Sequence, residues 1–125
     1  MFKILLIIGS GSFLGGVLRY LISYYIQEKF FTPFPIGTLA VNITGCLLIG
    51  IIFGLSDSRN LFSYEMRVFL SIGLCGGFTT FSTFSNETIA LLRDGEFFYA
   101  ITYISVSLFI CLLSTYLGII ITKIN

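Results

Sequence analysis

The sequence predicts an all-α membrane protein with four transmembrane helices. The chain has 125 residues, of which 56% are hydrophobic and only 10% are charged, and its mean hydropathy is +0.99. A soluble domain is normally about one-quarter charged. This chain therefore has too few polar groups to cover a water-exposed surface, and it is expected to lie in a bilayer.

Charged residues and two prolines divide the chain into four apolar segments. Each segment is near or above the roughly 20 residues that a helix needs to cross about 30 Å of hydrocarbon. The first apolar segment lacks an obvious small-x-small cleavage site, so we interpret it as a retained helix. The short connections predict antiparallel neighbours within one transmembrane domain, residues 1–125. The expected spans are residues 3–27, 36–56, 65–92 and 97–122.

The composition argues against several function classes. The net charge of +1 argues against a basic surface that would bind nucleic acid. Histidine is absent from the sequence, and no nucleophile–base pair stands out, so an enzyme is not indicated. The cysteines lie far apart in apolar runs without a CxxC pattern, which favours small buried residues over a zinc site or disulfides. They are Cys46, Cys75 and Cys111.

The basic residues at the ends of the spans only weakly specify an orientation. Four lie at one membrane face and two at the other, which is a small difference for the positive-inside rule. The sequence thus permits insertion in both orientations, and an antiparallel homodimer with a two-fold axis in the membrane plane. The two groups are Lys3, Arg59, Arg67 and Lys123 on one face, and Lys29 and Arg93 on the other.

Small residues recur four positions apart in the first two spans. Such pairs allow helices to approach closely in lipid, and we expect them to pack within the chain or between subunits. The pairs are Gly11 with Gly15, Ser12 with Gly16, and Gly50 with Gly54.

Arg19 and Glu87 are the charged residues deepest in their spans. An intramembrane charge costs at least about 2.5–3.5 kcal/mol at the bilayer centre, so each needs a partner or water. Three interpretations remain open: the two side chains pair with each other, they cap interrupted backbone, or they line a wet vestibule that attracts ions.

Two other spans carry polar residues at helical spacing. In the second span, Thr38, Asn42 and Gly45 share one face. The Asn42 amide is either an interhelical hydrogen-bonding group or a donor aimed at an anion. In the fourth span, hydroxyl and thiol groups recur every four residues, and we interpret this stripe as the lining of a pathway. The stripe consists of Tyr103, Ser107, Cys111 and Thr115.

The third span contains the least typical sequence, "CGGFTTFSTFSNE". Gly76 and Gly77 permit a break near its middle, which would free their carbonyls and that of Thr79 to accept from donors or a cation. Irregular backbone at this depth survives only when it is buried in protein or faces water. The third helix is therefore expected to be broken.

Phenylalanines alternate with hydroxyl residues after the two glycines. Phe81 and Phe84 share a face, and Thr83 is among the surrounding hydroxyl donors. A phenyl ring has a positive edge, so ring edges among hydroxyls form an uncharged lining that suits an anion. The alternative is that the phenylalanines face lipid or pack in the core.

Three motifs resemble the small four-helix fluoride channels of microbes, the Fluc or CrcB family. They are "GGVLRY" (15–20), "GTLAVNITG" (37–45) and "GGFTTFSTFSNE" (76–87). With the polar stripe of the fourth span, the resemblance covers essentially the whole chain. It implies a dual-topology antiparallel homodimer with two fluoride pores.

The resemblance also implies roles for individual residues. Phe81 and Phe84 would contact fluoride through their ring edges. Gly76 and Thr79 would offer carbonyls to a structural sodium ion at the dimer centre. Cys111 departs from the pattern where a hydroxyl is expected. Other implied residues are the pore-lining Asn42, the hydroxyl track Tyr103, Ser107 and Thr115 with Thr38 nearby, and the vestibule or structural charges Arg19 and Glu87.

The implied physiological role is passive export of cytoplasmic fluoride through the cell inner (plasma) membrane, which lowers fluoride toxicity. Hydrogen fluoride enters as a neutral acid and ionises, and a channel lets the anion leave. The alternatives are a proton-coupled small-ion or drug exporter, and a structural membrane subunit without transport activity.

Overall fold

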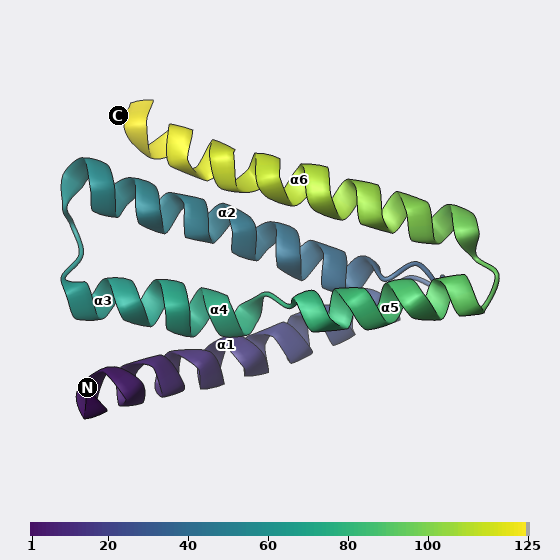
Figure 1. Cartoon of the computed structure of the whole chain (residues 1–125), viewed down its shortest axis with the longest axis horizontal. Coiled ribbons are helices and arrows are strands. Elements are labelled where there is room, and N and C mark those ends of the chain that lie inside the picture. The colour runs from purple at the N-terminus through teal and green to yellow at the C-terminus, as the bar shows by residue number, and fades with distance from the viewer. Residues whose placement is uncertain (125) are drawn as a thin grey trace.

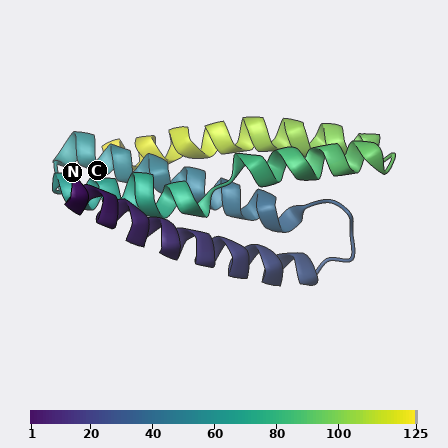
Figure 2. The same cartoon turned by 60° about the horizontal axis from the view of Figure 1, so that its bottom comes forward.

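The computed structural model describes residues 1–124 as a bundle of four long helical segments (Figure 1). All four are long and apolar enough to cross a membrane, which confirms the all-α, four-helix part of the predicted fold class. Successive segments are antiparallel, and both marked termini lie at the same end of the bundle (Figures 1 and 2). The segments are α1 (Phe2–Glu28), α2 (Ile36–Arg59), a third segment Tyr64–Arg93, and α6 (Phe97–Ile124).

Local residue preferences explain where the helices stop. Asn60 follows α2 with φ 54°, in the left-handed region where asparagine is favoured. Gly95 has φ 80° and reverses the chain between α5 and α6, a conformation that glycine adopts without a steric penalty. The Ser63 hydroxyl accepts from the backbone N–H of Met66 and caps the start of the third segment.

The third segment changes its helical form along its length. It consists of α3 (Tyr64–Val68), a π-helix η1 (Phe69–Cys75), α4 (Gly76–Phe78) and α5 (Phe81–Arg93). Gly76 and Gly77 are themselves helical, and the extended residues are Thr79 and Thr80 instead. The two parts stay nearly collinear, with a bend of only 16°. The predicted break near the middle of the third helix is therefore not confirmed.

Glycines permit close approach at two helix crossings. A Cβ added to Gly11 would lie 2.8 Å from the Phe69 carbonyl oxygen, and one on Gly15 would lie 2.8 Å from the Phe78 nitrogen. At the α2–α6 crossing, a Cβ added to Gly118 would lie 2.6 Å from the Leu47 carbonyl oxygen. Of the Ser12–Gly16 pair, Ser12 lies close to Gly77, whereas a Cβ added to Gly16 would meet nothing within 4 Å in the chain.

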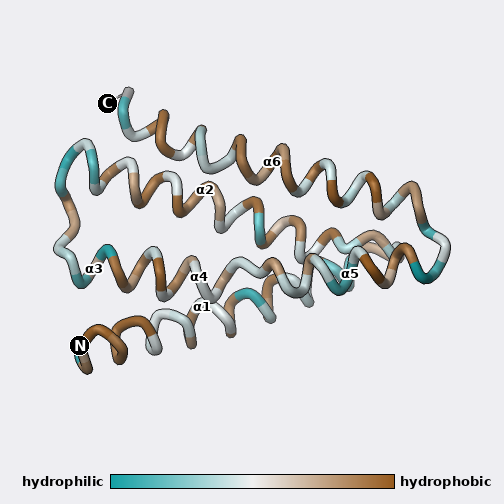
Figure 3. Tube along the Cα trace, in the orientation of Figure 1, coloured by the Kyte–Doolittle hydropathy of each residue, from teal (hydrophilic) through white to brown (hydrophobic). Residues whose placement is uncertain are grey.

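The outside of the bundle is mainly apolar. Large hydrophobic side chains are exposed along all four segments, and Figure 3 shows hydrophobic residues along the helices with hydrophilic ones concentrated at several helix ends and connections. Soluble monomers rarely expose so much contiguous apolar surface. The surface matches lipid or other membrane helices, and the polar groups that need a partner lie between the segments.

Candidate functional site

The interruption in the third segment is held by one side chain of α2. The Asn42 amide donates to the Thr80 carbonyl at 3.1 Å, and its oxygen accepts from the Thr80 N–H at 2.9 Å. Both main-chain groups of Thr80 would otherwise lack helical partners inside the bundle. Asn42 thus satisfies extended backbone at the depth where lipid offers no hydrogen bonds.

The bonds to Thr80 leave two main-chain carbonyls, those of Gly76 and Thr79, without the donors that a continuous helix would give them. In a continuous helix the Gly76 carbonyl would accept from the Thr80 N–H, but Asn42 takes that N–H. The Thr79 carbonyl would accept from the Thr83 N–H, but the Thr80 hydroxyl takes it at 3.1 Å. Both carbonyls therefore lose their usual helical donors.

Arg19 meets the same region from α1. Its Nε donates to the Gly77 carbonyl at 3.1 Å. Among residues 1–124, the ion pair is the exposed contact between Lys3 and Glu65, at 3.3 Å. Arg19 and Glu87 thus do not pair with each other, and the guanidinium caps backbone that follows the π-helix.

Glu87 is the centre of a second polar group. It accepts from the Thr38 hydroxyl at 3.0 Å and from the Tyr103 hydroxyl at 2.9 Å. The Tyr103 side chain is fully buried. Because each carboxylate oxygen has a donor, the partly buried Glu87 is stabilised without a cationic partner. It also lines a cavity of about 240 Å³ with Tyr24 and Gln27.

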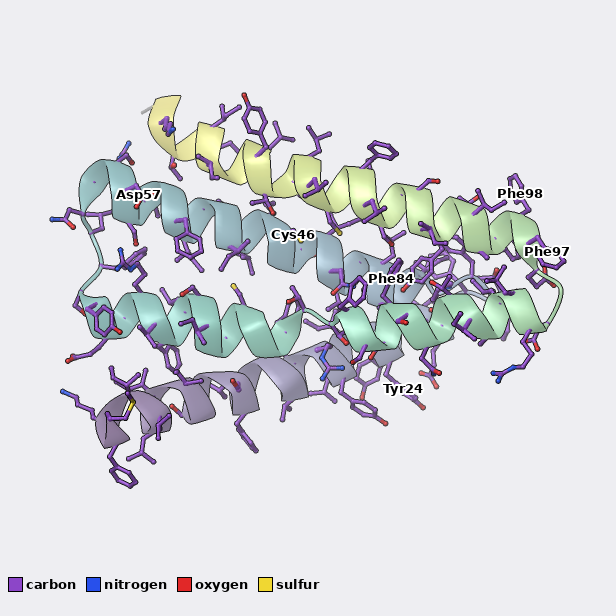
Figure 4. The ribbon with its side chains drawn as sticks, in the orientation of Figure 1. Tyr24, Cys46, Asp57, Phe84, Phe97 and Phe98 are labelled. Carbon is purple, nitrogen blue, oxygen red and sulfur yellow. The ribbon has the colours of Figure 1, made fainter. Side chains whose placement is uncertain are left out.

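Aromatic rings connect this polar group to the interruption. The Phe81 and Phe84 ring centroids are 5.5 Å apart, and those of Phe84 and Tyr103 are 5.0 Å apart. Both pairs are tilted, so ring edges rather than stacked faces are presented between them. Phe84 lies in the space between α5 and α2 (Figure 4), whereas Phe81 is 75% exposed in the single chain.

A groove of about 250 Å³ lies beside the interruption. It brings together the predicted Asn42, Phe81, Phe84 and Ser107, and no charged side chain lines it. The Ser107 hydroxyl is buried there without a hydrogen-bond partner in the described chain. The remaining lining residues are Cys46, Thr79, Thr80, Leu108, Cys111 and Leu112.

The other predicted pore residues lie outside this groove. Thr38 and Tyr103 bind Glu87. Thr115 donates to the Cys46 carbonyl at 3.0 Å, and the Thr83 hydroxyl accepts from that of Thr80 at 3.0 Å. The single chain therefore gives these four hydroxyls protein partners, and their contact with a permeating ion stays a prediction.

Two contributors were not identified from the sequence. Cys46 follows Asn42 by one helical turn and lines the groove. Its spacing of four from Asn42 places the two residues on one helix face, so the sequence could have indicated this position. Gln27 donates to the Thr32 and Phe34 carbonyls and accepts from the Gly37 N–H. It thereby fixes the connection that precedes Thr38, and no periodic pattern indicates this role.

The groove combines aromatic rings with uncharged polar groups. The Asn42 amide nitrogen carries two hydrogens, and one of them is bonded to the Thr80 carbonyl. The second is a further hydrogen-bond donor. The Ser107 hydroxyl offers another donor. Such a lining is able to replace part of the hydration shell of a small anion without holding it by a fixed positive charge.

Comparison with known proteins identifies the family. The model of the family described as CrcB-like protein, Camphor Resistance (CrcB), matches residues 6–119. The chain is 47% identical to a protein of Flavobacterium psychrophilum over 97% of this chain and 98% of that one. It is 50% identical to one of Phocaeicola vulgatus, over 94% of this chain and 96% of the other. Both relatives are named fluoride-specific ion channel FluC. This chain, a multi-pass membrane protein by its four helices, belongs to the CrcB family.

Proposed function

We propose that the chain forms a passive, fluoride-selective ion channel. The observation that carries this proposal is the uncharged groove, in which phenyl rings meet the Asn42 amide and the unpartnered Ser107 hydroxyl. Membership of the CrcB family and the names of its relatives support fluoride as the ion. Conduction needs binding that is favourable enough for entry and weak enough for release.

The groove suggests how fluoride would exchange water for protein. The second amide hydrogen of Asn42 and the Ser107 hydroxyl act as donors, while the edges of Phe81 and Phe84 contribute weaker positive potential. Because Asn42 is held on Thr80, its donor is pre-organised. An ion thus crosses without meeting a fixed cation that would retain it.

The functional unit in this proposal is an antiparallel dual-topology homodimer with two pores. The exposed Phe81 ring and the open groove beside it support a second chain completing the lining. A Cβ added to Gly16 would also meet nothing within 4 Å, which leaves room for another helix to approach closely.

A structural sodium ion at the dimer centre belongs to the same proposal. Gly76 and Thr79 fit this role because both carbonyls have lost their usual helical donors to Asn42 and Thr80. Gly76 is also exposed on the single chain. In this proposal the interruption of the third helix serves to present carbonyl oxygens, which are ligands for hard cations.

In the cell, the channel would act in the inner (plasma) membrane and export cytoplasmic fluoride. No coupling is needed, because the inside-negative potential favours exit of an anion. A proton-coupled exporter would instead depend on titration of Glu87, the carboxylate bound by Thr38 and Tyr103.

The test is ion efflux from liposomes that contain the purified protein, with fluoride and chloride compared. We expect rapid fluoride efflux and negligible chloride efflux. Equal fluxes, or none, would contradict the proposal, and absence of both would favour a structural subunit. Glu87→Gln provides the second comparison: a proton-coupled exporter loses pH-dependent flux, whereas a passive channel keeps part of its flux.

A further inference from the structure

Two free thiols on facing helices line the groove. Cys46 lies on α2 and Cys111 on α6, and both line the groove. The two helices are closely packed here, since a Cβ added to Gly50 of α2 would overlap the Thr115 carbonyl of α6. The Thr115 hydroxyl, one turn from Cys111, binds the Cys46 carbonyl at 3.0 Å and keeps the two helices in register here.

We propose that Cys46 and Cys111 form a binding site for soft metal ions that take two sulfur ligands, and that occupation of this site blocks the groove. Thiolates select soft metals. A linear bridge requires the two sulfur atoms to lie about two metal–sulfur bonds apart, at about 2.3 Å for each bond. Because α2 and α6 pack closely at this level, rotation of the two side chains sets that separation.

The membrane environment favours a divalent ion of this class. Binding of Hg²⁺ replaces both thiol protons: two S–H bonds break, two Hg–S bonds form and two protons leave. The product is neutral, so it avoids the penalty of a buried charge. The unpartnered Ser107 hydroxyl lines the same groove and is a polar neighbour for the bound ion.

Cys75 supplies the matched control. It is buried, only 3% exposed, and it does not line the groove. The Cys75→Ser variant keeps Cys46 and Cys111 as its two cysteines. Adding Cys46→Ala or Cys111→Ala to this variant removes one of these two thiols. Elution of each variant as a folded species in size-exclusion chromatography establishes that the comparison is valid.

The experiment titrates the purified variants with Hg²⁺ and measures free thiols and the ultraviolet absorption of the mercury–sulfur bond. With the pair intact, we expect one Hg²⁺ per chain to consume two thiols. Removing either cysteine should lower the concentration of soluble monothiol needed to extract Hg²⁺ by on the order of 100-fold. The reason is that the ion is then held by one sulfur of the chain, without a second sulfur in the same molecule to recapture it. One thiol consumed per Hg²⁺ with the pair intact, or equal retention in the single-cysteine variants, would overturn the site.

The blocking step is measured separately, and only this arm rests on the proposed channel function. The fluoride efflux of each variant is compared with and without Hg²⁺. The metal should abolish efflux in Cys75→Ser and should have no effect on efflux in the variant in which Cys46 and Cys111 are also alanine. Unchanged efflux in Cys75→Ser with Hg²⁺ bound would overturn the block. Absence of fluoride efflux from every variant before metal is added contradicts the proposed function, while the thiol titration still decides the metal site.

Discussion

Asn42 does two things with one amide group. It satisfies both main-chain groups of Thr80, and its nitrogen carries a second hydrogen beside the groove that Asn42 lines. An asparagine in a membrane helix is expensive unless its polar atoms are paired. The pairing to extended backbone therefore explains how the amide is tolerated inside the bundle.

Asn42→Ala should lower stability and fluoride flux together. The substitution leaves the Thr80 N–H and carbonyl without their partner, at a cost of about 1–3 kcal/mol for an unsatisfied group. Thermal unfolding in detergent and liposome efflux measure the two effects. Thr44→Ala is the control, because the Thr44 hydroxyl binds back to the Ala40 carbonyl of its own helix. Behaviour of Asn42→Ala equal to that of the control would show that the clamp is dispensable.

The two phenylalanines allow a sharper test of the aromatic lining. Phe81→Ile and Phe84→Ile keep apolar bulk but remove the positive ring edge. We expect both to reduce fluoride efflux. Phe84→Ile should also loosen Tyr103, whose ring is 5.0 Å away, whereas the exposed Phe81 has no such burial role in one chain. The comparison is Phe109→Ile, an exposed ring of α6 outside the groove. Unaltered efflux in both groove variants would contradict a role for the rings.

The spacing of residues along a helix predicts which side chains share a face, but not which partners they contact on other helices. Spacing of four placed Tyr103, Ser107, Cys111 and Thr115 on one face, and the structure brings Ser107 and Cys111 to the groove. The same spacing does not reveal which partner each hydroxyl finds on another helix. Tyr103 bonds to Glu87 and Thr115 to a carbonyl of α2, because those contacts depend on how α5 and α2 pack against α6.

At the scale of helices, the span boundaries were predictable because charged and turn-forming residues delimit apolar runs of membrane length. The interior of the third span was harder. Gly76 and Gly77 indicated a break, but glycine also permits close helix packing, and Gly77 contacts Ser12 of α1 so closely that a Cβ would lie 2.6 Å from its carbonyl oxygen. The extended residues are Thr79 and Thr80, where Asn42 supplies the missing hydrogen bonds.

Gly15→Ala should destabilise the crossing of α1 and α4. Its Cβ would overlap the Leu74 carbonyl and lie 2.8 Å from the Phe78 nitrogen, so the helices must separate, at about 1–3 kcal/mol for overpacking. Gly9→Ala is the matched control, because a Cβ there meets nothing within 4 Å and alanine favours a helix. A lower unfolding temperature for Gly15→Ala alone is expected. Equal unfolding temperatures would show that the backbones adjust without loss.

At the scale of the whole molecule, both chain ends lie at one end of the bundle (Figure 2), and the basic residues at the two ends number four and two. Added charge should therefore fix one orientation. Ser58→Lys with Asn60→Lys changes the balance to six against two. Arg59→Gln, Lys123→Gln, Glu28→Lys and Phe31→Lys together reverse it to two against four.

If conduction requires an antiparallel dimer, each charge variant alone should be inactive, since all of its chains insert the same way and cannot pair antiparallel. Co-expression of the two should restore fluoride efflux, because opposite orientations are then present in one membrane. A reporter fused to the C-terminus establishes the orientation of each variant, and glutamine at all six substituted positions controls for loss of local contacts. Full fluoride efflux from either variant expressed alone, with a single orientation confirmed, would contradict the antiparallel dimer.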